Sequence, residues 1–231
     1  MTSLIVGDIH GCWDEFQALL DLAALGWDDH IISVGDLVDR GPHSPRVLRF
    51  FRDTPNASSI MGNHERKHVR AEQGETNLAQ SQLITGLQFG DDYGAALDYM
   101  RTLPAFLELP EVDLVHGFFE PGVPIAEQRD AVLIGATSGE TYLTEKLDRP
   151  WYTLYDRVKP LIVGHRNYLG ITEPLLYPPE SPRVYALDTS CVYGGALTGL
   201  ILPDFRLISV PSRANYWADL QHEYDWLGDD N

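Results

Sequence analysis

Five short polar clusters in this 231-residue chain each follow directly on a run of aliphatic residues. The runs lie at 4–6, 31–34, 60–61, 114–115 and 161–163. The clusters that follow these runs are, in the same order, Gly7-Asp8-Ile9-His10-Gly11, Gly35-Asp36-Leu37-Val38-Asp39-Arg40-Gly41, Gly62-Asn63-His64-Glu65, His116-Gly117 and Gly164-His165. Such short apolar runs are typical of buried strands. Because ligands of α/β proteins bind beyond the carboxyl ends of strands, we expect the five clusters to meet at one site.

The spacing of the apolar runs also predicts the fold. In the first 65 residues we expect strands around 3–6, 31–34 and 58–61, alternating with helices around 13–25 and 44–52, which makes a parallel βαβαβ unit. After His116 the pattern changes to short apolar runs at 133–134, 160–163, 184–187, 197–202 and 207–210. These runs predict a second, largely antiparallel sheet packed on the first.

Composition indicates one globular domain over residues 1–231, since 44% of the residues are hydrophobic and 22% are charged. Within it, the polar stretch 66–100, interrupted by glycines, predicts a helical, cap-like insertion beside the site. The segment 217–231 predicts an acidic tail, of which 223–230 is expected to be solvated or loosely packed.

Charge and cysteine content restrict the partners. Lys and Arg number 17 against 34 Asp and Glu, and no cluster of basic residues suggests a basic groove, so we expect no long nucleic acid as partner. No apolar run is long enough for a bilayer or a signal peptide, so we expect no membrane partner. Only Cys12 and Cys191 occur, too few for a disulfide framework. We therefore expect a cytoplasmic protein with both thiols buried, and the oligomeric state stays open.

The clusters hold a donor set suited to two divalent cations. The predicted metal ligands are Asp8, His10, Asp36, Asn63, His116 and His165. Asp8 and His10 are two residues apart, so they project to the same side of an extended segment. Asp36 can extend one oxygen to each of two cations about 3.5–4 Å apart, while the amide and the other two histidines complete the second cation. A mixed oxygen and nitrogen shell favours Mn²⁺ first, with Fe or Zn²⁺ as alternatives.

Three further cluster residues suit catalysis. His64 is placed to donate a proton to a leaving oxygen, and Asp39 can hold its imidazole in the required tautomer. Arg40 offers a planar fork to phosphate oxygens. Two divalent ions outweigh two ligand carboxylates, and the surplus positive charge activates water and attracts an anion. The reaction predicted is in-line attack of metal-bound hydroxide on phosphorus, with no covalent enzyme intermediate.

The motifs GDIHG, GDLVDRG and GNHE, followed by His-Gly and Gly-His, resemble those of the calcineurin-like metallophosphoesterases, specifically the phosphoprotein-phosphatase branch. The resemblance spans roughly residues 4–211 and assigns the same roles to the same residues. It implies an α/β (α+β) fold, a two-sheet β-sandwich flanked by helices in four layers. Our first interpretation is a phosphoserine/phosphothreonine-type protein phosphatase that hydrolyses phosphate monoesters. The alternative is an asymmetric diadenosine tetraphosphate (dinucleoside polyphosphate) hydrolase, because 139–142, 150–152, 188–199 and 210–212 are similar to that subgroup.

Three stretches depart from the family pattern. Phe118-Phe119 stands where small residues are usual, which predicts a bulkier, more apolar pocket floor. Gly135-Ala136-Thr137-Ser138 stands where many relatives have Trp-x-Arg, so a second phosphate-binding arginine is missing. Arg166 is the candidate replacement, with Arg149 and Arg157 as alternatives. Asp188-Thr189-Ser190 replaces the usual Asp-Thr-Gly, which changes the geometry expected for that turn.

Other interpretations remain beside these. His64-Glu65-Arg66-Lys67-His68 matches the HExxH of zinc metalloproteases, but that function leaves four clusters without a role, so we expect His68 to be an exposed helix residue. A non-catalytic scaffold is a further alternative, although the chain keeps every expected site residue. Four aromatic residues either stack on an adenine or belong to the core. They are Trp151, Tyr152, Tyr155 and Tyr193.

Overall fold

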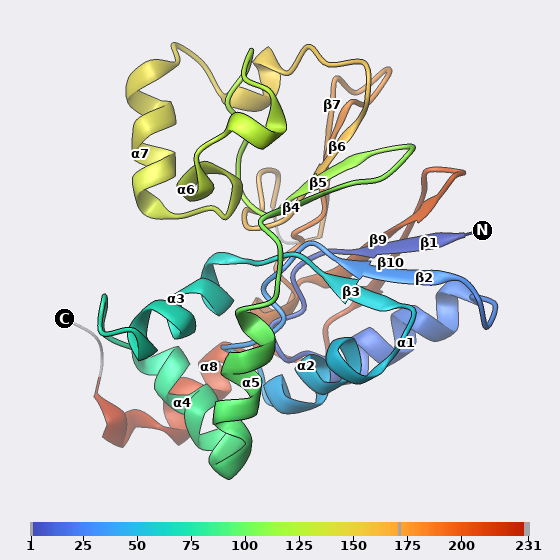
Figure 1. The fold of residues 1–231 in the computed structure, drawn as a ribbon. Coiled ribbons are helices and arrows are strands. Elements are labelled where there is room, and N and C mark those ends of the chain that lie inside the picture. Colours follow the sequence, from blue (N-terminus) through green and yellow to red (C-terminus); the bar gives the residue numbers. More distant parts are fainter. Residues whose placement is uncertain (1, 171, 229–231) are drawn as a thin grey trace.

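The computed structural model describes residues 2–170 and 172–228. Two five-stranded sheets pack face to face, and helices cover their outer faces (Figure 1). The layers are therefore helix, sheet, sheet and helix, which confirms the predicted four-layer α/β sandwich. Within the described residues, no helix combines the length and the apolar character that crossing a bilayer requires.

The first sheet has the strand order β10-β9-β1-β2-β3. Its strands are β1 (Ser3–Val6), β2 (His30–Ser33), β3 (Ala57–Ser59), β9 (Ala196–Leu202) and β10 (Arg206–Pro211). The parallel β1, β2 and β3 form the predicted βαβαβ unit. The two C-terminal strands were predicted in the second sheet, and that prediction was wrong: β9 pairs antiparallel with β1 and thereby extends the first sheet.

The second sheet has the order β4-β5-β6-β8-β7. Its strands are β4 (Phe106–Glu108), β5 (Asp113–Val115), β6 (Leu161–Val163), β7 (Leu175–Tyr177) and β8 (Val184–Ala186). The central β5, β6 and β8 are parallel and only the outer strands are antiparallel, so the expectation of a largely antiparallel sheet was wrong. The predicted strand at 133–134 is also wrong, because Leu133 ends a short helix.

Eight α-helices and five 3-10 turns complete the described part of the chain. The helices are α1 (Trp13–Ala23), α2 (Ser44–Asp53), α3 (Asn63–Glu72), α4 (Gln80–Phe89), α5 (Tyr93–Met100), α6 (Asp130–Leu133), α7 (Thr137–Lys146) and α8 (Tyr216–Glu223). The turns are η1 (Gly90–Asp92), η2 (Ile125–Glu127), η3 (Trp151–Leu154), η4 (Cys191–Tyr193) and η5 (Asp225–Leu227).

The two segments singled out from sequence are both helical. Residues 66–100 hold most of α3 and all of α4 and α5; α4 and α5 lie beside α2, and α3 packs on α5 (Figure 1). Their role as a cap stays a prediction. The described part of 217–231 is occupied by α8 and η5, with Leu220 buried, whereas the side chains of 223–228 are exposed or half-buried, so a loosely packed end stays a prediction. Residues 229–231 lie outside the described residues.

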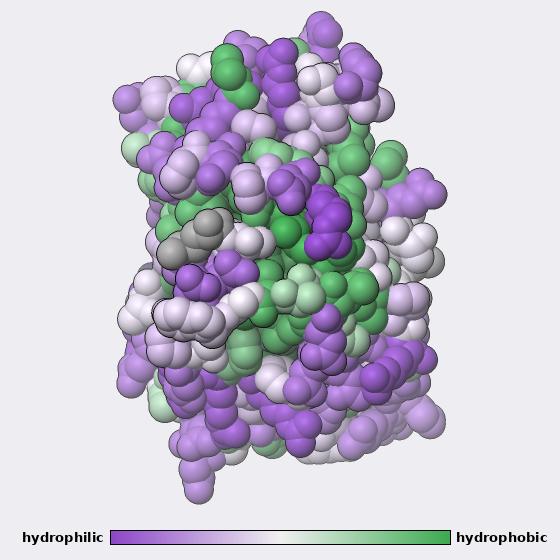
Figure 2. Space-filling model, turned by 90° about the vertical axis from the view of Figure 1, so that its right-hand side faces the viewer, coloured by the Kyte–Doolittle hydropathy of each residue, from purple (hydrophilic) through white to green (hydrophobic). Residues whose placement is uncertain are grey.

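Side-chain alternation along the strands explains the layers. Leu4 and Val6 face the helical side, where they join Phe16 and Leu19 of α1, whereas Ile5 faces the second sheet. Figure 2 views the side of the molecule where β1 and β2 begin, and it shows hydrophobic side chains in a band between hydrophilic upper and lower parts. The opposite ends of the parallel strands, in the interior behind this face, carry the polar clusters.

Candidate functional site

The polar clusters of both sheets meet at the carboxyl ends of the parallel strands. Asp36 Oδ2 lies 3.3 Å from His116 Nε2 and 3.5 Å from His10 Nε2. Asn63 Oδ1 lies 3.0 Å from His116 Nε2 and 2.9 Å from His165 Nδ1. Four of these five residues lie in loops after β1, β2, β5 and β6, and Asn63 begins α3 after β3, so the packing of the two sheets brings them together.

Asp36 belongs to two groups of potential metal ligands. One group holds His10, Asp36 and His64, and the other holds Asp36, His116 and His165, with the ligand atoms of each group within 4.8 Å of one another. Asp36 is thus the residue that the two groups share, and its bridging role stays a prediction. His64 stands in the first group, where Asp8 was expected.

Asp8 lies beside these groups in an acidic, buried setting. Its two carboxylate oxygens accept hydrogen bonds from the backbone N–H of His165, at 3.1 and 2.9 Å. Burial raises the pKa of Asp8 well above its usual value, and the nearby carboxylates of Asp188 and Asp36 raise it further. Burial also raises the pKa of Asp188. Two buried carboxylates with a half-buried third are stabilised by nearby positive charge, and this donor set fits divalent cations.

Two glycines make room for the acidic groups. A Cβ on Gly164 would lie 2.1 Å from Asp8 Oδ1, and a Cβ on Gly62 would lie 2.1 Å from Asp36 Oδ1. Any side chain at either position would displace the carboxylate. The glycines of the Gly-Asn-His-Glu and Gly-His motifs therefore serve packing around the site.

Backbone carbonyls orient two of the histidines. His10 Nδ1–H donates to Val38 O and His116 Nδ1–H donates to Val34 O, both at 2.8 Å, so each Nε2 faces the site. Burial lowers the pKa of His10 to about 3, which keeps its ring neutral and able to bind a metal. Burial also opposes charge on His116, but the Asp36 carboxylate outweighs it and raises the pKa of His116 to about 10.

Glu65 holds the loop that carries Asp36 against the start of α3. Its Oε1 accepts from the N–H groups of Leu37 and Val38, at 2.8 and 3.2 Å. Its Oε2 accepts from those of Asp36 and Gly62, both at 3.0 Å. Sequence reasoning gave this residue no role of its own. Four N–H donors to one buried carboxylate show that it positions the bridging residue and the turn before Asn63.

Asp39 connects two histidines of α3. Its Oδ2 lies 2.7 Å from His64 Nδ1, as the predicted pair requires, and its Oδ1 lies 2.8 Å from His68 Nε2. Burial opposes ionisation of Asp39, yet the charge of His68 and the hydrogen bonds from both histidines hold its pKa well below the usual value. Gln82 of α4 donates a further hydrogen bond to Oδ2.

The expectation that His68 is exposed was wrong. The side chain is fully buried, and its Nδ1 lies 2.7 Å from the Tyr93 hydroxyl. His68 lies four residues after His64, on the same helical face, and this spacing was the signal that could have placed it. Both of its nitrogens have partners and Glu65 is bound by backbone amides, so this HExxH sequence does not present a zinc-protease site.

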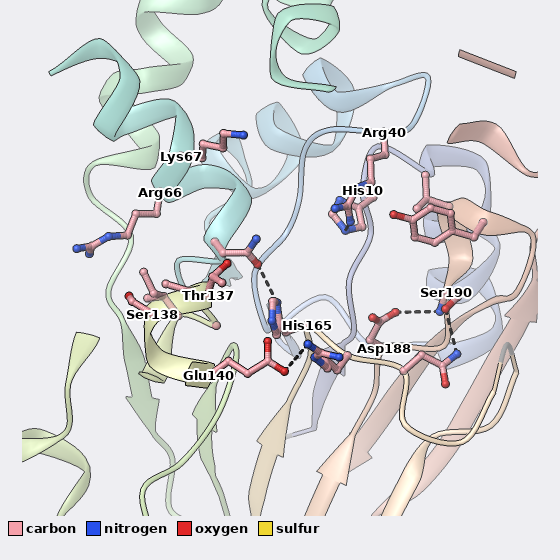
Figure 3. Close-up of a pocket in the computed structure, with 18 of the residues that line it drawn as sticks. His10, Arg40, Arg66, Lys67, Thr137, Ser138, Glu140, His165, Asp188 and Ser190 are labelled. Carbon is pink, nitrogen blue, oxygen red and sulfur yellow. Dashed lines mark hydrogen bonds and ion pairs between the residues drawn. The ribbon is translucent and has the colours of Figure 1, made fainter. Parts of the chain in front are cut away.

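A cleft of about 760 Å³ opens above the donor groups. Among the described residues, its lining includes five cationic side chains but only two carboxylates, those of Glu140 and Asp188. The cations are Arg40, Arg66, Lys67, Arg70 and Arg166. Figure 3 shows Arg66 and Lys67 on one side and Arg40 on the other, beside His10. The expectation of no basic groove was wrong, because the fold brings three cations that lie close together on α3 to the same cleft as the distant Arg40 and Arg166.

The candidate phosphate-binding arginines lie in different places. Arg40 Nη1 lies 3.3 Å from His10 Nε2, at the site. Arg166 lines the cleft, where its guanidinium pairs with Glu140. Arg149 pairs with exposed Asp148 outside this cleft, and Arg157 lies over the Phe119 ring. Of the three candidates for the missing arginine, the structure thus brings only Arg166 to the cleft.

The two other departures from the family pattern shape the cleft wall. The ring of Phe118 packs edge-on against that of His165, with centroids 5.2 Å apart, so this apolar residue lies directly behind the site. Ser190 adopts a left-handed conformation with φ of 59°, and its N–H donates to Asp188 Oδ1 at 2.8 Å. The turn therefore takes up the strain that a glycine would avoid and keeps Asp188 facing the cleft.

The aromatic residues divide between core and surface. Trp151 and Tyr155 are buried in the cluster outside the second sheet, and the half-buried Tyr152 packs on it. Tyr193 is 39% exposed and lies at the cleft, with the Arg40 guanidinium 5.6 Å from its ring centroid.

Both cysteines are buried, as expected, and they group with Glu15 behind the cleft. Burial raises the pKa of the Cys12 thiol well above its usual value, which disfavours a thiolate ligand. The Glu15 carboxylate accepts hydrogen bonds from the Arg213 N–H at 3.0 Å and the Tyr216 hydroxyl at 2.8 Å. This group therefore serves to tie the chain after β10 to α1.

Comparisons with known proteins agree with this geometry. A family model described as calcineurin-like phosphoesterase matches residues 1–167. The chain is 31% identical to the asymmetrical bis(5'-nucleosyl)-tetraphosphatase PrpE of Halalkalibacterium halodurans, over 90% of this chain and 93% of the relative. It is 27% identical to the symmetrical bis(5'-nucleosyl)-tetraphosphatase of Psychromonas ingrahamii, over 90% of this chain and 96% of that relative.

Solved structures share the fold. A protein described as a candidate diadenosine tetraphosphatase superposes with a TM-score of 0.73 at 28% identity, over 91% of this chain and 93% of the other. A serine/threonine phosphatase of Saccharomyces cerevisiae superposes with a TM-score of 0.59 at 14% identity, over 93% and 80%. The second likeness concerns the fold alone.

Proposed function

Because this chain belongs to the calcineurin-like phosphoesterase family, we propose that it is a metallophosphoesterase that hydrolyses dinucleoside polyphosphates asymmetrically. The class of enzyme follows from the family. The substrate is our proposal, and it replaces the protein phosphatase that was the first interpretation of the sequence. The alternative interpretation is the better supported one, since relatives spanning nine-tenths of the chain are named tetraphosphatases.

Family members use a dinuclear site of divalent metals, and we propose the six ligands predicted from sequence for it. One metal would take Asp8, His10 and Asp36, while the other would share Asp36. Asn63, His116 and His165 complete the second set. The buried carboxylates of Asp8 and Asp36 and the neutral imidazole of His10 support this assignment. The bound ions would polarise the phosphoryl group and lower the pKa of an attacking water. Mn²⁺ is our first choice of metal, with Fe or Zn²⁺ as alternatives.

We propose that His64 protonates the leaving oxygen. Asp39 supports this role because its carboxylate lies 2.7 Å from Nδ1, which leaves Nε2 directed at the site. His68 acts behind them as a positioning residue, since it holds the second oxygen of the same carboxylate. Arg40, next to His10 at the cleft, is suited to bind phosphate oxygens.

The cationic side of the cleft is the observation that carries the substrate proposal. Arg66, Lys67 and Arg70 extend along α3 from Asn63, over about 10 Å of helix. A single phosphate at the metal ligands would not reach the far end of this row. A polyphosphate chain would, and its charge is complementary to these residues in an otherwise acidic protein with a net charge of −17.

We further propose asymmetric rather than symmetric cleavage, and the cytoplasm as the location. The asymmetrical relative has the higher identity of the two compared, at 31% against 27%. Both cysteines are free, which suits a reducing compartment.

The proposal is tested by comparing kcat/KM for diadenosine tetraphosphate, a phosphoserine peptide and p-nitrophenyl phosphate in the presence of Mn²⁺. We expect the dinucleotide to be the best of the three by at least about tenfold, equivalent to about 1.4 kcal/mol of transition-state binding. A higher efficiency on the phosphoserine peptide would restore the protein-phosphatase interpretation.

A further inference from the structure

A second cavity, of about 540 Å³, adjoins the cationic cleft. It lies between α7 and η3 and shares Glu140, Arg166 and Asn167 with the cleft. Its size is within the range of pockets that hold small molecules. We call it the aromatic groove, after the apolar residues in its lining: Phe118, Leu143, Leu147, Trp151, Tyr152 and Tyr168.

A single aromatic side chain, that of Phe118, separates the groove from the proposed metal ligand His165. Phe118 lines it and packs its edge against the His165 ring at a centroid distance of 5.2 Å. Arg166 and Glu140, which line both groove and cleft, form an ion pair at the border between them. A molecule with its phosphate at the site can therefore reach the groove by passing a guanidinium, which is a good partner for phosphate or ribose oxygens.

The aromatic walls are held in place by one another. Tyr152 lies edge-on to Tyr168 and to Trp151, with centroids 5.2 and 6.0 Å apart. The indole Nε1–H of Trp151 donates to the Tyr168 hydroxyl at 3.2 Å. Such a wall is preorganised, so little side-chain entropy is lost when a flat ring binds to it. The polar rim of Asp148, Arg149 and Asn167 offers donors and acceptors to a heterocycle.

We infer that the aromatic groove is the binding site for one nucleoside of the substrate, whose phosphates occupy the cationic cleft. This inference rests on the proposed function for the identity of the whole substrate. It gives a role to the bulky Phe118, which stands where the resemblance leads us to expect a small residue: the ring forms the floor between the phosphate site and the base. In this arrangement, the ion pair of Arg166 and Glu140 lies where the phosphates of the substrate join the nucleoside.

Two threonines of α7 provide a matched pair of variants. Thr144 and Thr141 are both exposed, and each hydroxyl donates to the carbonyl four residues earlier at 2.9 Å. Thr144 lines the groove, whereas Thr141 lines neither cavity. A tryptophan at 144 would fill the groove from an exposed position, and a tryptophan at 141 would make the same chemical change outside it.

The test measures binding of AMP and of ribose 5-phosphate, which lacks the base, to the Mn²⁺-loaded protein by calorimetry. We expect AMP to bind the wild type at least about tenfold more tightly than ribose 5-phosphate. Thr144→Trp should abolish this advantage without weakening ribose 5-phosphate binding, and Thr141→Trp should keep it. Equal affinities of the two ligands in the wild type, or an unchanged advantage in Thr144→Trp, would overturn the inference.

Failure of the groove and failure of the proposed function give different results. If the wild type does not hydrolyse diadenosine tetraphosphate, the proposed function is wrong. The ratio of the AMP affinity to the ribose 5-phosphate affinity still shows whether the groove binds a nucleoside. If it does hydrolyse the dinucleotide, Thr144→Trp should lower kcat/KM for it at least about tenfold and leave p-nitrophenyl phosphate unchanged. If Thr144→Trp hydrolyses the dinucleotide as efficiently as the wild type, the proposed function stands but the groove does not bind the nucleoside.

Discussion

Asp39 Oδ1 lies 2.8 Å from His68 Nε2, deep behind the site. The other oxygen of this carboxylate lies 2.7 Å from His64, so the two histidines of α3 hold one anion between them. Tyr93 of α5 binds the far nitrogen of His68 at 2.7 Å. The orientation of the proposed acid thus depends on how α3 and α5 pack together.

We expect His68→Asn to lower kcat on an alkyl phosphate about tenfold, which is part of the about 10²–10⁴ that a general acid contributes. The reason is that Asp39 loses a partner and holds His64 less firmly. The rate on p-nitrophenyl phosphate should change little, because its leaving group needs little protonation. His222→Asn, at an exposed position of α8, is the control. Equal losses on both substrates would show general structural damage instead of a positioning role.

The same carboxylate predicts a pH dependence of stability. The pKa of Asp39 in the folded protein is well below its ordinary value of 3.8. Its stabilising effect is therefore complete above the ordinary value and is lost as the pH falls through the lower, folded-state pKa. In denaturation of the metal-free protein between about pH 6 and pH 3, Asp39→Asn should lose less stability on acidification than the wild type. Parallel curves for the two proteins would contradict this.

Glu65→Gln should damage both folding and metal binding. The amide places an N–H₂ group against backbone N–H donors, so we expect a loss of about 1–3 kcal/mol in the free energy of unfolding. Metal affinity should fall about 10- to 100-fold, because Asp36 is no longer held in position. Glu72→Gln is an exposed control on the same helix. If metal titration gives wild-type affinity for Glu65→Gln, this positioning role is wrong.

The cationic row on α3 predicts a charge effect on binding. Lys67→Met combined with Arg70→Met should raise KM for diadenosine tetraphosphate about 2- to 10-fold, since exposed charge pairs contribute about 0.2–1 kcal/mol each. The effect should weaken at high salt. Arg46→Met with Arg52→Met changes net charge equally on α2, and neither residue lines the cleft. A similar rise of KM in both double variants would indicate a general effect of net charge.

The strand ends and the ligand cluster could be predicted from sequence because that information is local. Each apolar run is followed at once by its polar residues, and parallel strands must bring such residues to one edge. The pairing of β9 with β1 could not be predicted, because it joins segments almost 200 residues apart and periodicity carries no pairing information. The run at 133–134 was too short to distinguish a strand from a helix.

The surroundings of the site were the harder part to predict. His68 was taken for a surface residue because its partners, Asp39 and Tyr93, lie 29 and 25 residues away. Glu65 was overlooked because its partners are backbone N–H groups, which leave no trace in a sequence pattern. The basic cleft was missed because its cations come from α3 and from loops in both halves of the chain.

The most direct test of the proposed function is the identity of the products formed from diadenosine tetraphosphate by metal-stripped protein, with and without added Mn²⁺. We predict that AMP and ATP appear in equal amounts, and only when the metal is present. Formation of ADP alone would contradict asymmetric cleavage. No release of nucleotide, under conditions in which a phosphoserine peptide is dephosphorylated, would contradict the substrate itself.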